Sequence, residues 1–292
     1  MSSASWYHEL TGRAPSRVPM LPLSHALSVF GEWDDARIQS DLIAPLLVCN
    51  EIELTSYQQR LCKPVPEAEP KARLFNVPTH QCGCTIVMGI DDERGKAIIS
   101  VGPTSEAGSQ HCFQVRRAHL FPDRVTAILE GELLVRNGTD EPMRLPMAFH
   151  DRDFALCRGY YHVGRVSDFV IAGIALMVAS VQGNGTAQFL ALDSVCLSCR
   201  HFRGKVVSVE PMFGFGPIGE MNQGVPHMDN LPLIHGQRVW RVKTLIGEAP
   251  DLAIDLVVTE RATHNSPDML TAGAWIDGIA VMTGHCLWLS GN

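Results

Sequence analysis

The sequence predicts an all-β protein, and two observations support this prediction. From about His80 onward, short apolar segments recur along the chain, and residues that favour turns separate them. Their close spacing is typical of barrels and sandwiches, since parallel sheets need long helical connections between strands. With 292 residues, the chain is long enough to bury a core and to form one large β architecture or two domains.

Residues 1–70 differ from the rest of the chain because they contain several prolines and two short helical patterns. One pattern begins at Asp34 and is stopped by Pro45, and a second runs from Leu54 to Leu61. The stretch Lys63–Lys71 is rich in Pro and Glu, which predicts a linker. We therefore expect a partly helical N-terminal arm and linker at residues 1–70.

Strand patterns dominate the sequence beyond this arm. Thr85–Ile90 and Lys96–Val101 flank a polar turn that ends in Gly95, which predicts a β-hairpin within residues 71–105. The longest apolar run, Phe169–Val181, is too short for a membrane span of roughly 20 residues and is expected to be a buried strand pair or core segment. Further strands are predicted at Val125–Val135, Val206–Val209, Val239–Ile246, Leu252–Val258 and Ile279–Leu289.

A weak internal repeat relates residues 113–181 to residues 202–291. Each half opens with a short strand and continues with a longer one, and each closes with a glycine followed by an apolar strand, at Gly164 and Gly273. Glycines of this kind are typical of barrel corners, where a Cβ would clash as the strand coils. We therefore expect the two halves to form related small barrels.

This pattern resembles the OB-fold, a small five-stranded barrel, over roughly residues 106–292. The resemblance implies one barrel at residues 106–195 and a second at residues 196–292. The helix that OB-folds usually carry between the third and fourth strands would fall at Asp151–Arg158 and at His264–Leu270, and both segments are short. The predicted fold is therefore all-β, with two OB-like barrels preceded by a partly helical N-terminal segment.

Four of the nine cysteines have the spacing of metal ligands. Cys196 and Cys199 form a C-x-x-C pair, while Cys82 and Cys84 alternate along a predicted strand and so project to one face. Zn²⁺ is bound by four Cys or His ligands in a tetrahedron. These four residues are therefore a candidate structural zinc site, and the alternative is that they pack as small apolar side chains.

Sequence motifs of catalysis are missing from this chain. No G-x-S-x-G and no H-E-x-x-H occurs, and the G-x-G-x-x-G at Gly214–Gly219 is followed by prolines and glycine instead of a helix. His150, Asp151 and Asp153 form a small cluster, which is expected to be a solvated loop or a helix cap. An enzyme is therefore the less favoured class, with a metal-dependent enzyme built on a Cys/His centre kept as an alternative.

The charge balance weighs against a general nucleic-acid role. The formal net charge is −7 and no third of the chain is basic, whereas nucleic-acid binders gain affinity by neutralising phosphates. An alternative is single-stranded nucleic-acid binding through an OB-like face made of Arg238, Trp240, Arg241 and Lys243. A second mixed patch of basic and aromatic residues comprises Arg158, Tyr160, Tyr161, His162 and Arg165.

The leading functional hypothesis is a non-enzymatic binding or interaction module that is a subunit of a larger assembly. Residues 212–237 and 1–25 are apolar without a regular pattern, and we expect them to contact a protein partner or a second copy of the chain. The alternative is that both segments cover the open ends of the predicted barrels. The N-terminus has no basic region followed by an apolar run, as a signal peptide would. A cytoplasmic protein without a membrane span is therefore expected.

Overall fold

A computed structural model provides the structure of this chain. It describes residues 62–65, 71–77, 82–91, 95–105, 107–121, 126–135, 142–183, 185–192, 196–212, 238–247 and 252–287. Before residue 105, and at 155–156, the backbone alone is described. The predicted helices before residue 62, the arm 1–25 and residues 213–237 of the apolar segment lie outside the described residues.

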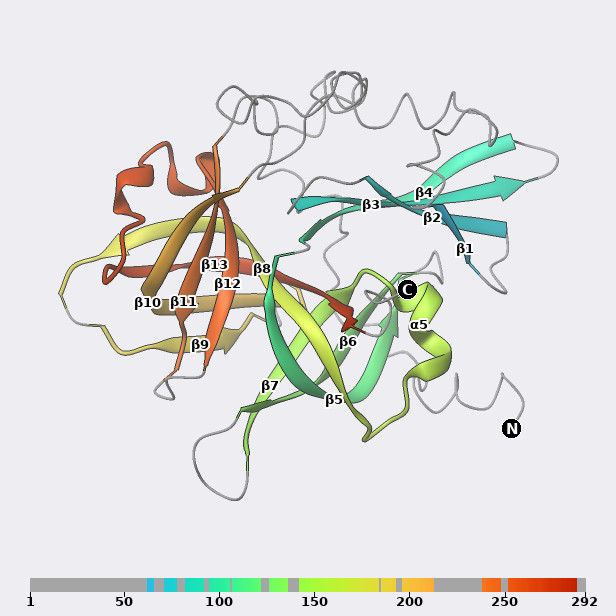
Figure 1. The fold of residues 1–292 in the computed structure, drawn as a ribbon, viewed down its shortest axis with the longest axis horizontal. Coiled ribbons are helices and arrows are strands. Elements are labelled where there is room, and N and C mark those ends of the chain that lie inside the picture. The colour runs from blue at the N-terminus through green and yellow to red at the C-terminus, as the bar shows by residue number, and fades with distance from the viewer. Residues whose placement is uncertain are drawn as a thin grey trace.

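Strands make up most of the described residues, which confirms the predicted all-β class (Figure 1). The described helical segments are short, and none reaches seven residues. None of the described helices is long and apolar enough to cross a membrane. The strands form one sheet of four strands and one sheet of nine strands.

The four-stranded sheet precedes the larger one in the sequence. Its antiparallel strands follow the order β1-β2-β3-β4. Residues 63–65 of β1 belong to the stretch predicted to be a linker, so that prediction is wrong for these residues. The strand is tolerated there because β1 has one described neighbour, and an edge strand can hold a proline such as Pro64. The bounds are β1 Cys62–Val65, β2 Lys71–Val77, β3 Cys82–Asp91 and β4 Gly95–Ser105.

The nine-stranded sheet contains all the remaining described strands. The apolar run Phe169–Val181 is part of one continuous strand, β8, and not a pair of strands. The predicted strand Val206–Val209 is the middle of a much longer one, β10. The bounds are β5 Ser109–Leu120, β6 Ala127–Val135, β7 Met143–Asp151, β8 Val166–Val181, β9 Gln188–Ala191, β10 Cys199–Met212, β11 Val239–Leu245, β12 Ala253–Thr259 and β13 Trp275–Cys286.

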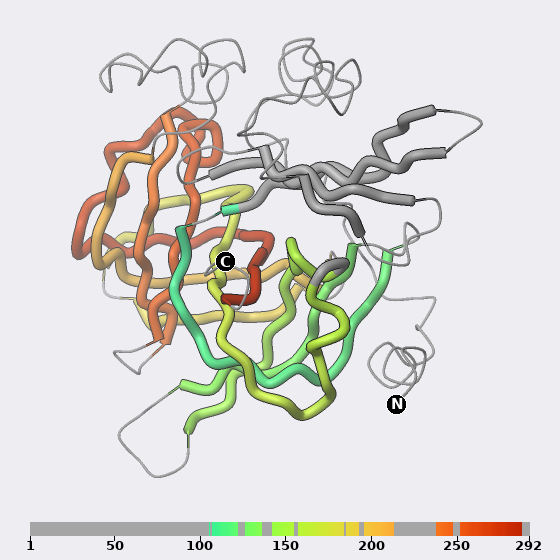
Figure 2. The backbone as a smooth tube through the Cα atoms, turned by 45° about the vertical axis from the view of Figure 1, so that its right-hand side comes forward, coloured from blue at the N-terminus to red at the C-terminus, as the bar shows by residue number. Residues whose placement is uncertain are grey.

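Strand pairing in this sheet traces two rings that share β8 and β13. The first ring runs β5-β6-β7-β13-β8, and the second runs β10-β11-β12-β8-β13. Short parallel contacts complete them, β7 with β13 at His150↔Thr283 and β12 with β8 at Leu256↔Gly173. Each ring therefore takes one strand from the other half of the chain, and the two groups of strands lie side by side (Figure 2).

The two halves repeat the same backbone hydrogen bonds where β8 and β13 begin. Gly164 N–H donates to the Val115 carbonyl and Gly273 N–H donates to the Val206 carbonyl, both at 2.8 Å. The glycines have φ values of 81° and 87°, which an L side chain adopts only with strain. A β-bulge follows Val115 in β5 and Val206 in β10. These shared features allow each position in one half to be matched with a position in the other.

Short helical segments precede β8 and β13. α5 (Phe154–Cys157) and η3 (Arg158–Tyr160) come before β8, and η5 (Arg261–Thr263) and η6 (Pro267–Met269) come before β13. Of these, α5 and η6 fall within the segments Asp151–Arg158 and His264–Leu270 named from the sequence. Buried side chains from both halves form one core cluster. The described interior of the first ring is rich in aromatic rings, while that of the second is mainly aliphatic, with Val242, Ile254, Leu256, Val258 and Ile276.

Candidate functional site

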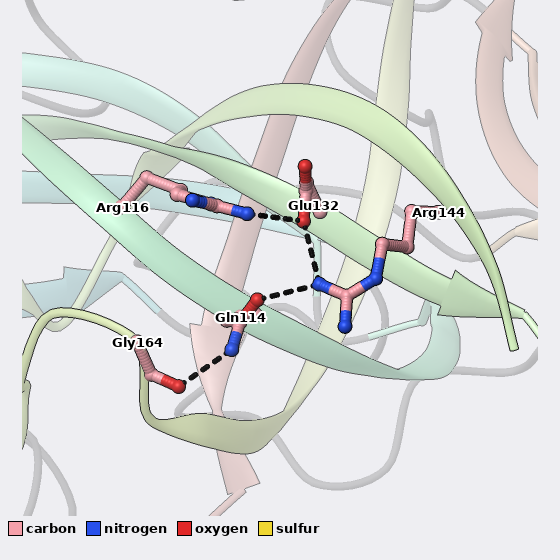
Figure 3. A network of polar contacts seen from close by, with 5 residues as sticks. All are labelled: Gln114, Arg116, Glu132, Arg144 and Gly164. Carbon is pink, nitrogen blue, oxygen red and sulfur yellow. Dashed lines mark hydrogen bonds and ion pairs between the residues drawn. The ribbon is translucent and has the colours of Figure 1, made fainter. Parts of the chain in front are cut away.

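Two arginines, one glutamate and one glutamine form a polar network on the outer side of the first ring (Figure 3). Arg116 Nη2 and Arg144 Nη1 both donate to Glu132 Oε2, at 2.9 and 3.0 Å. Arg144 Nη1 also donates to Gln114 Oε1 at 2.9 Å, and Gln114 Nε2 donates to the Gly164 carbonyl at 2.7 Å. We call the surface formed by these five residues the arginine face.

Strand register brings the arginine face together from three strands. Gln114 of β5 lies directly opposite Glu132 of β6, so their side chains share one side of the sheet. Arg144 of β7 is opposite Leu134, one diagonal step from Glu132. Arg116 is the extra residue at the β-bulge of β5, and a bulge re-aims its side chain toward a neighbouring strand. The bond from Arg116 to Glu132 therefore starts at the bulge, whereas the bonds from Arg144 to Glu132 and Gln114 do not involve the bulged residue.

Electrostatics leave the arginine face with an excess of positive charge. The side chains of Arg116 and Arg144 are 55% and 51% exposed, while Glu132 is 22% exposed. Hydrogen bonds from Arg116 and then Arg144 lower the pKa of Glu132, so this carboxyl is ionised at neutral pH. One carboxylate thus neutralises one of two guanidinium groups, and both groups remain reachable from solvent.

The turn before β8 adds exposed basic and aromatic side chains beside this face. Gly164 N–H donates to the Val115 carbonyl and Val115 N–H donates to the Arg165 carbonyl, and these two bonds fasten the turn to β5. The side chains of Tyr160, His162 and Arg165 are exposed. Tyr161, which the sequence analysis grouped with them, is instead buried. Of the five residues of the mixed patch identified from the sequence, Tyr160, His162 and Arg165 are therefore exposed, Arg158 is partly exposed and Tyr161 is buried.

The face predicted for nucleic acid in the second half is balanced by acidic groups. Arg238 Nη2 donates to Glu260 Oε1 at 2.6 Å, and its guanidinium lies 5.5 Å from the ring centre of Trp240. Trp240 is partly buried and packs against the core. Trp240 therefore presents little open ring surface for a base to stack on.

Arg241 and Lys243 lie on the other side of β11. Arg241 Nη2 donates to Asp255 Oδ2 at 2.8 Å, and Arg241 also lies 3.9 Å from Glu210. Lys243 is exposed and sits directly opposite Asp255 in β12. Of the four predicted nucleic-acid residues, two arginines are thus ion-paired and the tryptophan is largely covered.

Asp255 is the centre of a buried polar cluster. The residue is 1% exposed, and its Oδ2 accepts hydrogen bonds from both Arg241 and the Ser109 hydroxyl, the latter at 2.9 Å. His111 lies close to it: burial lowers the pKa of His111 to about 4, Asp255 opposes the shift, and Lys243 adds to it. The histidine is therefore neutral at physiological pH.

The structure places the candidate zinc ligands on different elements. Cys196 and Cys199 are both buried in a small apolar cluster with Ile128, Ala148 and Val281. A hydrogen bond with Cys196 and burial raise the pKa of the Cys199 thiol, which therefore stays protonated. Cys82 and Cys84 belong to β3, where only the backbone is described. Among the described residues, no group of three or more His, Cys, Asp or Glu side chains is arranged to hold a metal ion.

The cluster of His150, Asp151 and Asp153 is buried, so the expectation of a solvated loop is wrong. Asp153 does occupy the N-cap position of α5, but its side chain makes no capping hydrogen bond. Tyr161 donates to Asp151 Oδ2 at 2.6 Å, and burial followed by the charge of Asp153 raises the pKa of Asp151. Burial lowers the pKa of His150. The ring of Phe121 stacks on His150, and the buried Tyr161 bonds to Asp151, so both residues are closed off from solvent.

Sequence reasoning missed the residues of the arginine face. Gln114, Arg116, Glu132 and Arg144 come from three strands, and no short motif contains them. The available signal was the polar residue at alternate positions of each strand, which marks an outward face but not its partners. The bulge that turns Arg116 toward Glu132 has no signature in this sequence.

Comparisons with other proteins add no relative. Neither the models of known protein families, nor curated proteins, nor solved structures gave a match to this chain.

Proposed function

We propose that this chain is a non-enzymatic binding module that holds an anionic partner on the arginine face. The observation that carries the proposal is the sharing of Glu132 by Arg116 and Arg144, two guanidinium groups that are half exposed yet fixed in position. A guanidinium matches carboxylate and phosphate groups with two parallel hydrogen bonds. Arginines that are already oriented lose less side-chain entropy when such a group binds.

Burial of the reactive side chains supports a binding role over a catalytic one. Of the thiols that the structure describes, those of Cys157, Cys196, Cys199 and Cys286 are buried, and the exposed Cys112 donates to Asp168 Oδ1 at 3.3 Å. A neighbouring carboxylate disfavours the thiolate that a nucleophile requires. His150 and Asp151 are likewise closed off from solvent.

Two classes of anionic partner fit this face, a nucleic-acid strand and an acidic protein surface. The exposed Tyr160 and His162 beside the arginines favour single-stranded nucleic acid, because bases stack on exposed aromatic side chains. The acidic charge of the whole chain favours a protein partner, since it repels phosphates at long range. A subunit of a larger assembly fits either class, and the first ring replaces Arg238 and Trp240 as the proposed contact surface.

Fluorescence anisotropy with two labelled probes tests the proposal. One probe is a single-stranded DNA oligonucleotide and the other is a glutamate-rich peptide of equal charge. We expect wild-type protein to bind at least one of them at low salt, and the double variant Arg116→Gln, Arg144→Gln to bind about tenfold more weakly with a shallower salt dependence. Glu132→Gln should strengthen binding, because it removes the anion and leaves both arginines.

Arg238→Gln is the matched control, because Arg238 is also an exposed arginine paired with one glutamate. It should leave binding of either probe unchanged. If Arg238→Gln weakens binding and the double variant does not, the contact surface surrounds Trp240 and the proposal is wrong. Absence of binding to both probes by wild-type protein would also reject it.

A further inference from the structure

β9 is the open edge of the nine-stranded sheet. It pairs with β10 on one side, from Gln188↔Arg203 to Ala191↔Arg200, and no described strand pairs with its other side. Every other described strand of this sheet has neighbours on both sides, because the two rings close on themselves. An unpaired edge presents free N–H and C=O groups that another strand can extend.

The ladder register shows which backbone groups of β9 face outward. Leu192 N–H donates to the Cys199 carbonyl at 3.1 Å, in the same register as the β9–β10 pairs. Hydrogen-bonded pairs alternate along an antiparallel ladder, so Leu190 and Gln188 also direct their N–H and C=O groups toward β10. Phe189 and Ala191 therefore direct theirs away from the sheet.

We propose that β9 pairs antiparallel with β9 of a second copy of this chain and so joins the two sheets into one. The outward groups of Phe189 and Ala191 are placed symmetrically about Leu190. Phe189 of one copy then exchanges both hydrogen bonds with Ala191 of the other, and the reverse pair does the same. Leu190 lies on the twofold axis, facing Leu190 of the partner in a non-hydrogen-bonded pair.

The side chains of β9 favour its own copy over a charged partner. The strand reads Gln-Phe-Leu-Ala, without the lysine, proline or bulge that usually protects an edge. Leu190 is 54% exposed, and cross-strand pairing sets it in one row with His201, Ile279 and the exposed Met177. The two Leu190 side chains would meet at the axis, and on each side His201, which bonds to Asp277, separates Leu190 from Ile279 and Met177. Only four residues pair, so the dimer is expected to dissociate readily on dilution.

Sedimentation velocity over a range of protein concentrations tests this dimer. Wild-type protein should sediment faster as its concentration rises. Leu190→Lys should weaken association by at least about tenfold, because it sets two like charges opposite each other on the axis. Val207→Lys is the matched control, since Val207 is a strand residue that is also 50% exposed, and it should dimerise as wild type does. A wild-type protein that stays monomeric at every concentration overturns the proposal.

A disulfide trap tests the geometry and does not depend on a disruptive variant. In a non-hydrogen-bonded antiparallel pair, Cβ atoms are about 4.5–5.5 Å apart, close to the range that a disulfide spans. Leu190→Cys should therefore form a covalent dimer under mild oxidation, while Val207→Cys and wild-type protein should not. If wild-type protein dimerises but Leu190→Cys gives no covalent dimer and Leu190→Lys still associates, another surface forms the dimer and the inference is wrong.

Discussion

In the two halves of this chain, side chains of different polarity pack over corresponding positions of the sheet. Ala148 of β7 and Asp255 of β12 occupy corresponding positions. The first residue after the bulge pairs with Glu130 in the first half and with Lys243 in the second. Glu130 in turn pairs with Ala148, and Lys243 pairs with Asp255. Around Ala148 the covering side chains are apolar: Ile128, Cys196, Cys199 and Val281. Around Asp255 they are polar, with Ser109 and Arg241 bonded to the carboxylate.

The same backbone arrangement therefore accepts either apolar side chains or an ion pair over this part of the sheet. Apolar contacts are non-directional, so the loss of one group costs its own burial and a small cavity. A buried ion pair is weak evidence for stability, but the removal of one partner strands the other charge. The second half should therefore be the more sensitive to single polar substitutions, and the first half to the loss of its aromatic core.

The largest loss of stability is expected for substitutions in the two cores, at Phe149 in the first half and at its matched residue Leu256 in the second. Both are fully buried, and Phe149 also contacts the rings of Phe113 and Phe169 at 5.0 and 5.3 Å between centroids. Phe149→Ala should lower the free energy of unfolding by about 3–5 kcal/mol. Leu256→Ala should lower the free energy of unfolding by about 1 kcal/mol less than Phe149→Ala does, because it breaks no ring pair. Urea unfolding measures both, and equal losses would contradict this contrast.

A smaller loss of stability is expected when the ion pair between Arg241 and Asp255 is broken. Arg241→Ala should lower the free energy of unfolding by about 2–3 kcal/mol, because the buried carboxylate of Asp255 keeps only the Ser109 hydroxyl. The double variant Arg241→Ile, Asp255→Ala copies the matched residues Ile128 and Ala148 of the first half. The double variant should lose less free energy of unfolding than Arg241→Ala does. A double variant that is less stable than Arg241→Ala would show that the two covers are not interchangeable.

Acid should destabilise the protein through His111, whose matched residue is Phe202. The pKa of His111 in the folded protein is lowered to about 4, so between that value and its ordinary value of about 6.5 the unfolded chain binds a proton that the folded chain does not. The neutral His111 therefore contributes fully to the free energy of unfolding above about pH 6.5. This contribution falls with the pH, by about 2 kcal/mol between pH 7 and pH 5. His111→Phe should remove this part of the loss in thermal unfolding measured at both pH values. An unchanged loss would contradict the assignment.

The smallest expected effect is the same in both halves. Gly164 and Gly273 have positive φ values, and an added Cβ would meet no atom within 4 Å at either position. Alanine at each site should therefore cost only backbone strain, about 1 kcal/mol. The two single variants should have equal unfolding midpoints, and a clear difference would show that the two turns are not equivalent.

Sequence patterns predicted the fold class and many of the strands, because alternation and turn residues are local signals. β11 and β12 lie almost where Val239–Ile246 and Leu252–Val258 were predicted, and Gly164 and Gly273 were recognised as a repeated feature. The exchange of β8 and β13 could not be predicted, because it depends on parallel contacts of two or three residue pairs between distant segments. The arginine face was missed for a related reason, since it joins residues of β5, β6 and β7 whose pairing is not a local signal.

Because β13 belongs to both rings, it affects how the chain folds while the ribosome synthesises it. β13 follows every other described strand in the sequence, yet His150 of β7 finds its parallel neighbour, Thr283, only in that strand. Pairing across so long a stretch of chain is slow, because the intervening chain must be ordered first. Until β13 is synthesised, the emerging first half exposes an unfinished strand edge and aromatic core, which is the state that chaperones bind and that aggregates. The first half is therefore made early but can be completed only late.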